Sequence, residues 1–170
     1  MASPTIHLRP VVFADISTFF EHMQHAPAQQ MAAFIHEDPA DRAVHDAHWS
    51  RLLSNDAIIK RSIELVHPGG EPELVGHIIS FTMDADREIT YWIDHHHWGK
   101  GIASEALRQF LLIEKTRPLS GRAAKDNGSS VRVMEKNGFR LLREERGYAN
   151  ARAAQIDEVV MVLQAQDHED

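Results

Sequence analysis

With 170 residues, 43% of them hydrophobic and 25% charged, the chain is long and apolar enough for one folded domain with a full core. The formal net charge of −7 argues against general nucleic-acid binding, because a phosphate backbone would be repelled, and it suits a small-molecule ligand or a cationic amine. The absence of cysteine excludes disulfide and thiolate chemistry and fits a cytoplasmic protein. No apolar run approaches the ~20 residues of a membrane span, and the N-terminal segment lacks a signal-peptide pattern.

The first half of the chain predicts one strand, two helices and then two strands. Hydrophobic periodicity and chain breakers place these elements at 5–9, 13–23, 41–53, 57–66 and 74–83. Asp15 is expected to cap the first helix from just inside its start, and a Pro-Gly-Gly turn joins the last two strands. The segment 24–40 shows no regular pattern, and its apolar patch at 31–35 is either core or a homodimer contact.

The stretch 87–104 organises the second half of the chain. It begins with the alternation of a strand at 88–93 and continues through a histidine-rich turn into Gly99-Lys100-Gly101. An apolar helical pattern then starts at Ile102. A strand that passes through glycines into a helix can bind a phosphate, because bare backbone approaches the ligand and the first helical turn offers N–H groups without internal partners.

The remaining predicted elements are a strand at 119–124, a helix at 127–136 and strands at 139–145 and 155–163. Strands and helices do not alternate regularly, so a doubly wound dinucleotide fold fits poorly. We predict an α/β (α+β) protein with a mostly antiparallel mixed sheet flanked by helices. The whole of 1–165 is expected to form a single domain, followed by a frayed acidic tail at 166–170.

Two segments carry a resemblance to a known family. The run Trp98-Gly99-Lys100-Gly101-Ile102-Ala103 resembles a pyrophosphate loop of the form Gln/Arg-x-x-Gly-x-Gly/Ala, with Trp98 in the Gln/Arg place. The run 127–139, Asn-Gly-Ser-Ser-Val-Arg-Val-Met-Glu-Lys-Asn-Gly-Phe, is similar to Asn-x-x-Ser…Glu-Lys-x-Gly-Phe. Together and in this order, they resemble the GCN5-related N-acetyltransferase (GNAT) family, and within it the RimJ/RimL-like branch.

This resemblance implies acetyl-CoA as co-substrate and acetyl transfer to a primary amine, either a protein N-terminus or a small amine, by direct attack. Backbone groups near the end of the strand at 88–93 would hold the pantetheine arm, and the amides of 99–104 would hold the pyrophosphate. Two residues of the second motif would touch the pantetheine or the adenosine side. The expected cofactor-binding residues are Ile93, Asp94, Trp98, Gly99, Lys100, Gly101, Ile102, Ala103, Ser104, Asn127 and Ser130.

Glu88 is the candidate general base, because an amine attacks a thioester only in its neutral form and needs a proton acceptor. The alternative is a solvated glutamate paired with Arg87. Many family members have a tyrosine just before Glu-Lys-x-Gly-Phe that protonates the leaving thiolate, whereas this chain has Met134 there. Ser130 could substitute, as could Tyr148 in a predicted flexible turn. A thiolate with a pKa near ~8.5 is also a fair leaving group without a dedicated acid.

The histidines at 95–97 are expected to point in different directions, so we predict a solvated loop beside the phosphates and no metal site. His45 and His48 share a helix face and serve either packing or an acceptor pocket. Lys100 and Arg132 either meet cofactor phosphates or face solvent.

Three functions remain open from the sequence. The leading one is an acetyl-CoA-dependent N-acetyltransferase. The second is a non-catalytic CoA-binding or regulatory module, which Met134 keeps open. The third is a nucleotide-phosphate site, which is disfavoured because neither Gly-x-x-x-x-Gly-Lys-Ser/Thr nor Gly-x-Gly-x-x-Gly occurs.

Overall fold

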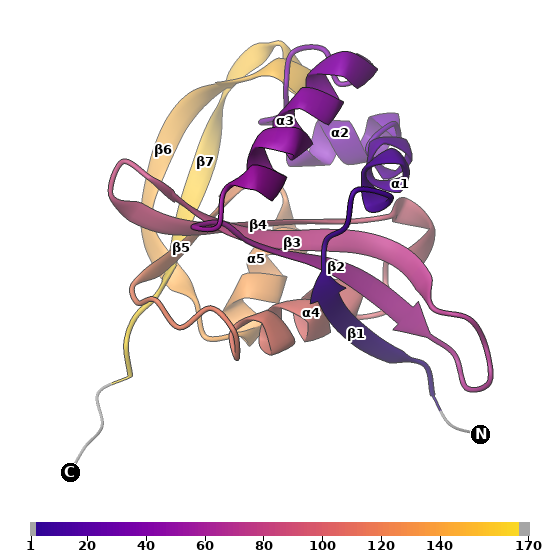
Figure 1. The fold of residues 1–170 in the computed structure, drawn as a ribbon. Coiled ribbons are helices and arrows are strands. Elements are labelled where there is room, and N and C mark those ends of the chain that lie inside the picture. Colours follow the sequence, from indigo (N-terminus) through magenta and orange to yellow (C-terminus); the bar gives the residue numbers. More distant parts are fainter. Residues whose placement is uncertain (1–2, 167–170) are drawn as a thin grey trace.

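A computed structural model describes residues 3–166, which fold around one seven-stranded sheet with the strand order β1-β2-β3-β4-β5-β7-β6 (Figure 1). The strands are β1 (Thr5–Pro10), β2 (Ile59–Val66), β3 (Glu73–Met83), β4 (Asp86–Ile93), β5 (Leu119–Ala124), β6 (Arg140–Ala149) and β7 (Ala154–Leu163). The helices are α1 (Asp15–His22), α2 (Ala26–Ala32), α3 (Arg42–Ser54), α4 (Ile102–Phe110) and α5 (Gly128–Lys136), with short 3-10 turns η1 (His95–His97) and η2 (Asn150–Arg152).

The sheet is mixed, since β4 and β5 run parallel while every other neighbouring pair is antiparallel. The predicted fold class, a mostly antiparallel mixed sheet flanked by helices, is confirmed. Of the predicted acidic tail, 167–170 lie outside the described residues.

Helices cover both faces of the sheet, with α1, α2 and α3 on one face and α4 and α5 on the other (Figure 1). The larger apolar cluster packs the buried face of α4, including Leu107 and Phe110, against Ile78 and Ile89 of the sheet. A smaller cluster on the opposite face joins α1 and α3 to β3. Among the helices of residues 3–166, none has the length and apolar character that a bilayer crossing requires.

The predicted capping role of Asp15 is wrong. Asp15 is already inside α1, and it is buried with its carboxylate 2.7 Å from the guanidinium of Arg9. It also accepts hydrogen bonds from the Ser62 hydroxyl at 2.8 Å and the Val12 amide at 2.9 Å. The capping pattern was misleading because the side-chain partners, Arg9 and Ser62, come from β1 and β2, which the local sequence does not show to be neighbours.

The helix α2 was missed within the segment predicted to be irregular. Pro27 lies at its first turn, where a missing N–H costs nothing, and the ring of His25 caps the helix by accepting from the Ala28 amide at 3.2 Å. The apolar patch at 31–35 begins at the C-terminal end of this helix. Its centre, Ala33, is fully buried and packs with Phe34 as core, while Met31 at the edge is 36% exposed.

Candidate functional site

The sheet opens between its two parallel strands. β4 and β5 pair only at Glu88 with Ser120 and at Ile89 with Gly121. Beyond these pairs the strands separate, although β4 stays paired with β3 along its other edge. The second half of β4 therefore presents an open edge inside the sheet.

The backbone groups on this open edge can be assigned from the strand register. The Asp94 amide donates to the Val75 carbonyl at 2.8 Å, so the groups of Asp94 belong to the ladder with β3. Because neighbouring residues direct their N–H and C=O groups to opposite edges of a strand, those of Tyr91 and Ile93 face the gap. The indole Nε1 of Trp98 donates to the Ile93 carbonyl at 3.0 Å and so joins the following loop to this edge.

The gap leads into a cavity of about 320 Å³, within the size range of small-molecule sites. Four parts of the chain line it: β4, the glycine loop with the first turn of α4, α5 with Asn127 before it, and α2. The lining residues are Ala28, Met31, Ala32, Tyr91, Trp92, Ile93, His97, Trp98, Gly99, Gly101, Ile102, Ala103, Ser104, Asn127, Ser129, Ser130, Arg132, Val133 and Lys136.

Two glycines shape the loop before α4. Gly99 and Gly101 have φ values of 77° and 75°, a left-handed conformation that side chains with a Cβ rarely adopt. No atom lies within 4 Å of where a Cβ would stand at either position, so backbone geometry and not crowding requires glycine. No side chain caps the N-terminus of α4. Its first-turn N–H groups, at Ile102–Ser104, therefore remain able to bind an acceptor from outside the chain.

The α5 side of the cavity is held by a short hydrogen-bond chain. The Asn127 side chain caps α5 by accepting from the Ser130 amide at 3.2 Å. The Ser130 hydroxyl lies 2.8 Å from the hydroxyl of Tyr91. Burial raises the pKa of Tyr91 to about 12, with the Ser130 contact opposing, so Tyr91 stays neutral at physiological pH. Asn127 and Ser130 thus fix the cavity wall as well as line it.

The two basic candidates occupy different places. Arg132 lines the main cavity from α5. Lys100 lines a second hollow on the other side of the loop, together with Ile6 and Glu105. The predicted cofactor-binding residues therefore line the main cavity with two exceptions, Lys100 and Asp94.

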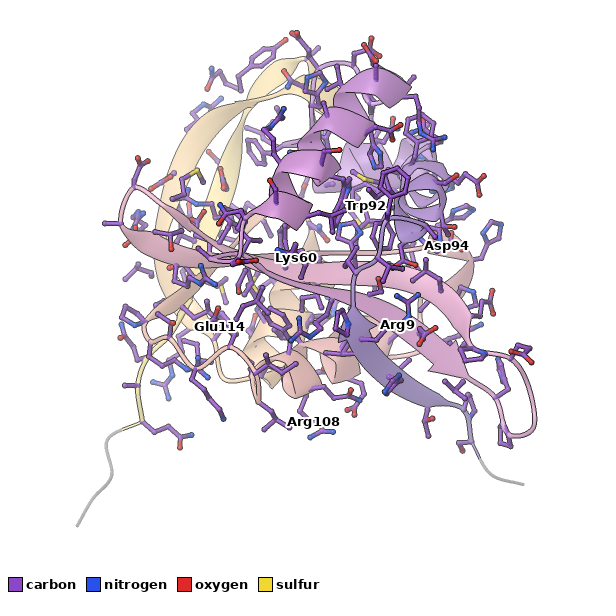
Figure 2. The ribbon with its side chains drawn as sticks, in the orientation of Figure 1. Arg9, Lys60, Trp92, Asp94, Arg108 and Glu114 are labelled. Atoms are coloured by element: carbon purple, nitrogen blue, oxygen red, sulfur yellow. The ribbon has the colours of Figure 1, made fainter. Side chains whose placement is uncertain are left out.

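Glu88 lies at the point where the two strands separate, but not in the cavity lining. Its side chain is buried, and Oε1 accepts from Arg122 Nε at 2.6 Å. The alternative pairing with Arg87 is wrong, because Arg87 binds Glu114 at 2.9 Å. By strand alternation Glu88 faces the same side as Trp92, which is the α1–α3 side of the sheet. Figure 2 shows Trp92 there, and its indole donates to the His22 carbonyl at 3.3 Å.

Arg122 gathers two further carboxylates around Glu88. Its Nη1 lies 2.7 Å from Glu145 and 3.5 Å from Glu158. Burial raises the pKa of Glu158, and the like charges of Glu145 and Glu88 add to this effect against the attraction of Arg122. These three carboxylates face two guanidinium groups, since Arg143 also pairs with Glu145 at 2.6 Å, so the cluster has one carboxylate in excess beside the end of the gap.

The possible proton donors to a leaving thiolate are placed as follows. Met134 is buried under Gly121 in the sheet and does not line the cavity. The prediction that Tyr148 lies in a flexible turn is wrong. Tyr148 lies in β6 and pairs with Gln155, because β6 and β7 continue to Ala149 and Ala154. Ser130 does line the cavity, yet its hydroxyl is engaged with Tyr91.

The histidines differ in their surroundings. His96 is exposed, as the solvated-loop prediction requires, whereas His97 is buried, lines the cavity and holds Glu73 at 3.0 Å. His45 packs edge-on against Phe20 with ring centroids 5.2 Å apart, so the packing interpretation holds for it. The burial of His97 was missed because it depends on a contact with Glu73 in β3, which lies earlier in the sequence.

Sequence reasoning missed the contributions of Tyr91 and α2 to the cavity. The strand alternation at 88–93 puts Tyr91 on the face of Ile93, and this signal was available. No comparable signal identified Ala28 and Met31, since the helix that carries them was not predicted.

This fold and site define a class of protein. Residues 5–140 match the family model described as the acetyltransferase (GNAT) domain, which covers most of the chain. The chain therefore belongs to the GNAT family, as its two motifs predicted.

One curated protein and two solved structures illustrate what this chain is similar to. The chain is 27% identical over 114 residues to the ribosomal-protein-serine acetyltransferase of Escherichia coli (strain K12), a match that covers 55% of this chain and 63% of that protein. Spermidine N-acetyltransferase from Vibrio cholerae, solved with CoA and spermine, superposes with a TM-score of 0.78 at 15% identity, over 94% of this chain and 95% of that chain. RimJ of Mycobacterium smegmatis, solved with CoA-disulfide, superposes with a TM-score of 0.73 at 22% identity. This match covers 97% of this chain and 84% of that chain.

Proposed function

We propose that this protein transfers the acetyl group of acetyl-CoA to a primary amine by direct attack. One observation carries the proposal: an open strand edge, a glycine loop and an uncapped helix N-terminus follow one another along a single cavity. An open edge can pair with the amide groups of a pantetheine arm, as sheet edges pair with peptides. Helix N–H groups suit the pyrophosphate that follows it.

The residues divide this binding between them. The backbone of Tyr91 and Ile93 would hold the pantetheine arm, and the amides of 99–104 would hold the pyrophosphate. Asn127 and Ser130 would form the opposite wall. Lys100 would reach a phosphate from the adjoining hollow. Asp94 has its amide committed to β3, so it would act through its carboxylate alone.

Acetyl-CoA supplies an activated acyl group when bound, and the protein's remaining task is to deprotonate the amine. A lysine-like amine with pKa ~10.4 costs about 4.6 kcal/mol to neutralise at pH 7, and an α-amine with pKa ~8 only about 1.4 kcal/mol, at ~1.36 kcal/mol per unit. Glu88 is the proposed acceptor of this proton, directly or through water. Arg122 would keep its carboxylate oriented.

The acceptor is proposed to be a protein N-terminus or a small cationic amine. The names of the relatives, a ribosomal-protein-serine acetyltransferase and a spermidine N-acetyltransferase, support both. The net charge of −7 and the carboxylates around Arg122 favour a positively charged acceptor. Use of acetyl-CoA also agrees with the proposed cytoplasmic location. The formation of a homodimer is a separate hypothesis.

Release of free CoA thiol with a panel of N-terminal peptides, polyamines and amino acids tests the proposal. We expect turnover with at least one cationic amine, and acetyl-CoA binding in calorimetry. Binding without turnover across the panel would support the alternative, a non-catalytic CoA-binding module, for which Met134 in the usual tyrosine place is the motivating feature. Thermal shifts compare acetyl-CoA with ATP and NAD, and greater stabilisation by ATP would refute the CoA site.

A further inference from the structure

A turn between β4 and the glycine loop brings three metal-binding side chains together. Asp94 Oδ1 lies 3.4 Å from His95 Nδ1 and 3.2 Å from His96 Nδ1. These three atoms all lie within 4.8 Å of one another. Figure 2 shows Asp94 at the end of β4, on the side of α1.

The sequence expectation that these histidines diverge is not met for the first two. Asp94 precedes the 3-10 turn η1, and its carboxylate folds forward over the next two residues. Only His97 turns away, toward Glu73. The tight turn thus does what an extended strand cannot, since alternation in a strand would send neighbouring side chains to opposite faces.

Two of the three spacings in this cluster fit a small divalent ion, and the third, between the two histidine nitrogens, is at most 4.8 Å. Zinc binds imidazole nitrogen and carboxylate oxygen at roughly 2.0–2.2 Å in tetrahedral geometry, which separates ligand atoms by roughly 3.3–3.5 Å. The two distances from Asp94 Oδ1, 3.4 and 3.2 Å, match this separation. Two imidazoles and a carboxylate also form a donor set that zinc and related ions prefer.

The histidine at the centre of the cluster is held in place and lacks a hydrogen-bond partner. The ring of His95 stacks on His25 with centroids 3.6 Å apart and an interplanar angle of 3°. Its Nδ1 is buried and forms no hydrogen bond within the described residues. A buried nitrogen of this kind is costly to leave without a partner, and a metal ion would satisfy its lone pair.

We propose that Asp94, His95 and His96 bind a divalent transition-metal ion such as Zn²⁺, with the remaining coordination position open to solvent. His96 is exposed, so the ion can enter from bulk water. This site is separate from the residues proposed for acetyl transfer, apart from the Asp94 carboxylate, and it does not depend on that activity.

Calorimetric titration with Zn²⁺ tests the proposal on chelator-treated protein without a polyhistidine tag. We expect one equivalent of Zn²⁺ to bind, and affinity to fall at least roughly tenfold in both Asp94→Asn and His96→Ala. Even the loss of a residue that only supports a ligand typically costs 10–100-fold. His96 is exposed, so its removal should leave the fold intact, which thermal unfolding verifies.

The matched control is His7→Ala. His7 is an exposed histidine whose Nδ1 lies 3.5 Å from Glu64, so it has one carboxylate neighbour but belongs to no three-ligand group among residues 3–166. The control should bind Zn²⁺ like the parent protein. Absence of binding in the parent, or unchanged binding in Asp94→Asn and His96→Ala, would overturn the proposal, the latter by placing the ion among other histidines.

Discussion

Replacement of His77 by leucine should remove a large part of the protein's sensitivity to mild acid. His77 lies in β3, 7% exposed, with its ring 4.8 Å from Phe19 and 5.0 Å from Trp49 between centroids. Its Nδ1 is buried without a hydrogen-bond partner among the described residues. Burial, together with the charges of nearby histidines, lowers the pKa of His77 to about 3.

The sign and size of the effect follow from this pKa. The unfolded chain has a histidine pKa of 6.5, so below that pH it binds a proton that the folded chain excludes until about 3. Stability from the neutral His77 is therefore full above the unfolded pKa and is lost as the pH falls. At pH ~5 the difference is ~1.5 units, which at ~1.36 kcal/mol per unit destabilises the fold by about 2 kcal/mol.

Urea denaturation at pH ~7.5 and ~5 measures this contribution. We expect wild type to lose about 2 kcal/mol more than His77→Leu between the two conditions, because the other histidines titrate in both proteins and cancel. Ile79→Val is the control. It changes the same face of β3 without a titratable group, and should cost about 0.5–1.5 kcal/mol equally at both pH values. Equal acid losses in wild type and His77→Leu would refute the reasoning.

Four further predictions concern the site and the ion pairs. Gly101→Ala should weaken acetyl-CoA binding in calorimetry and destabilise the fold by about 1–2 kcal/mol through its left-handed φ of 75°; unchanged affinity would contradict the loop assignment. Glu88→Gln should lower kcat roughly 100-fold at an unchanged KM for acetyl-CoA, unlike the matched Glu145→Gln, and a comparable loss in both would argue against Glu88 as the base. Glu114→Ala should lower the free energy of unfolding in urea by about 3–5 kcal/mol, because it leaves the guanidinium of Arg87 without its carboxylate partner. A loss under ~1 kcal/mol would show the pair to be unimportant. Asp126→Ala, which breaks an exposed pair, should cost at most ~1 kcal/mol in the same assay, and a larger loss would contradict its exposed character.

Much of the site could be predicted from the sequence because most of its residues lie in short contiguous segments. The strand at 88–93, the glycine loop and the capped helix after Asn127 each carry local signals, and the structure brings them to one cavity.

The parts that failed depend on partners distant in sequence. Asp15 carries the pattern of a cap but pairs with β1 and β2 residues, and Glu88 was assigned a neighbour, Arg87, in place of Arg122 from β5. The apolar patch that begins at Met31 could be assigned to core only once α2 was placed beside β5 and β6.

By itself the sequence determined most of the elements, the family and the loop, because hydrophobic period, turn residues and glycine positions act over a few residues. Tertiary structure alone decided where β4 and β5 separate, which carboxylates surround Arg122, and that Asp94, His95 and His96 converge. The physical reason is that charge pairing and side-chain convergence depend on distances through space, which strand order and turn geometry set and local spacing does not.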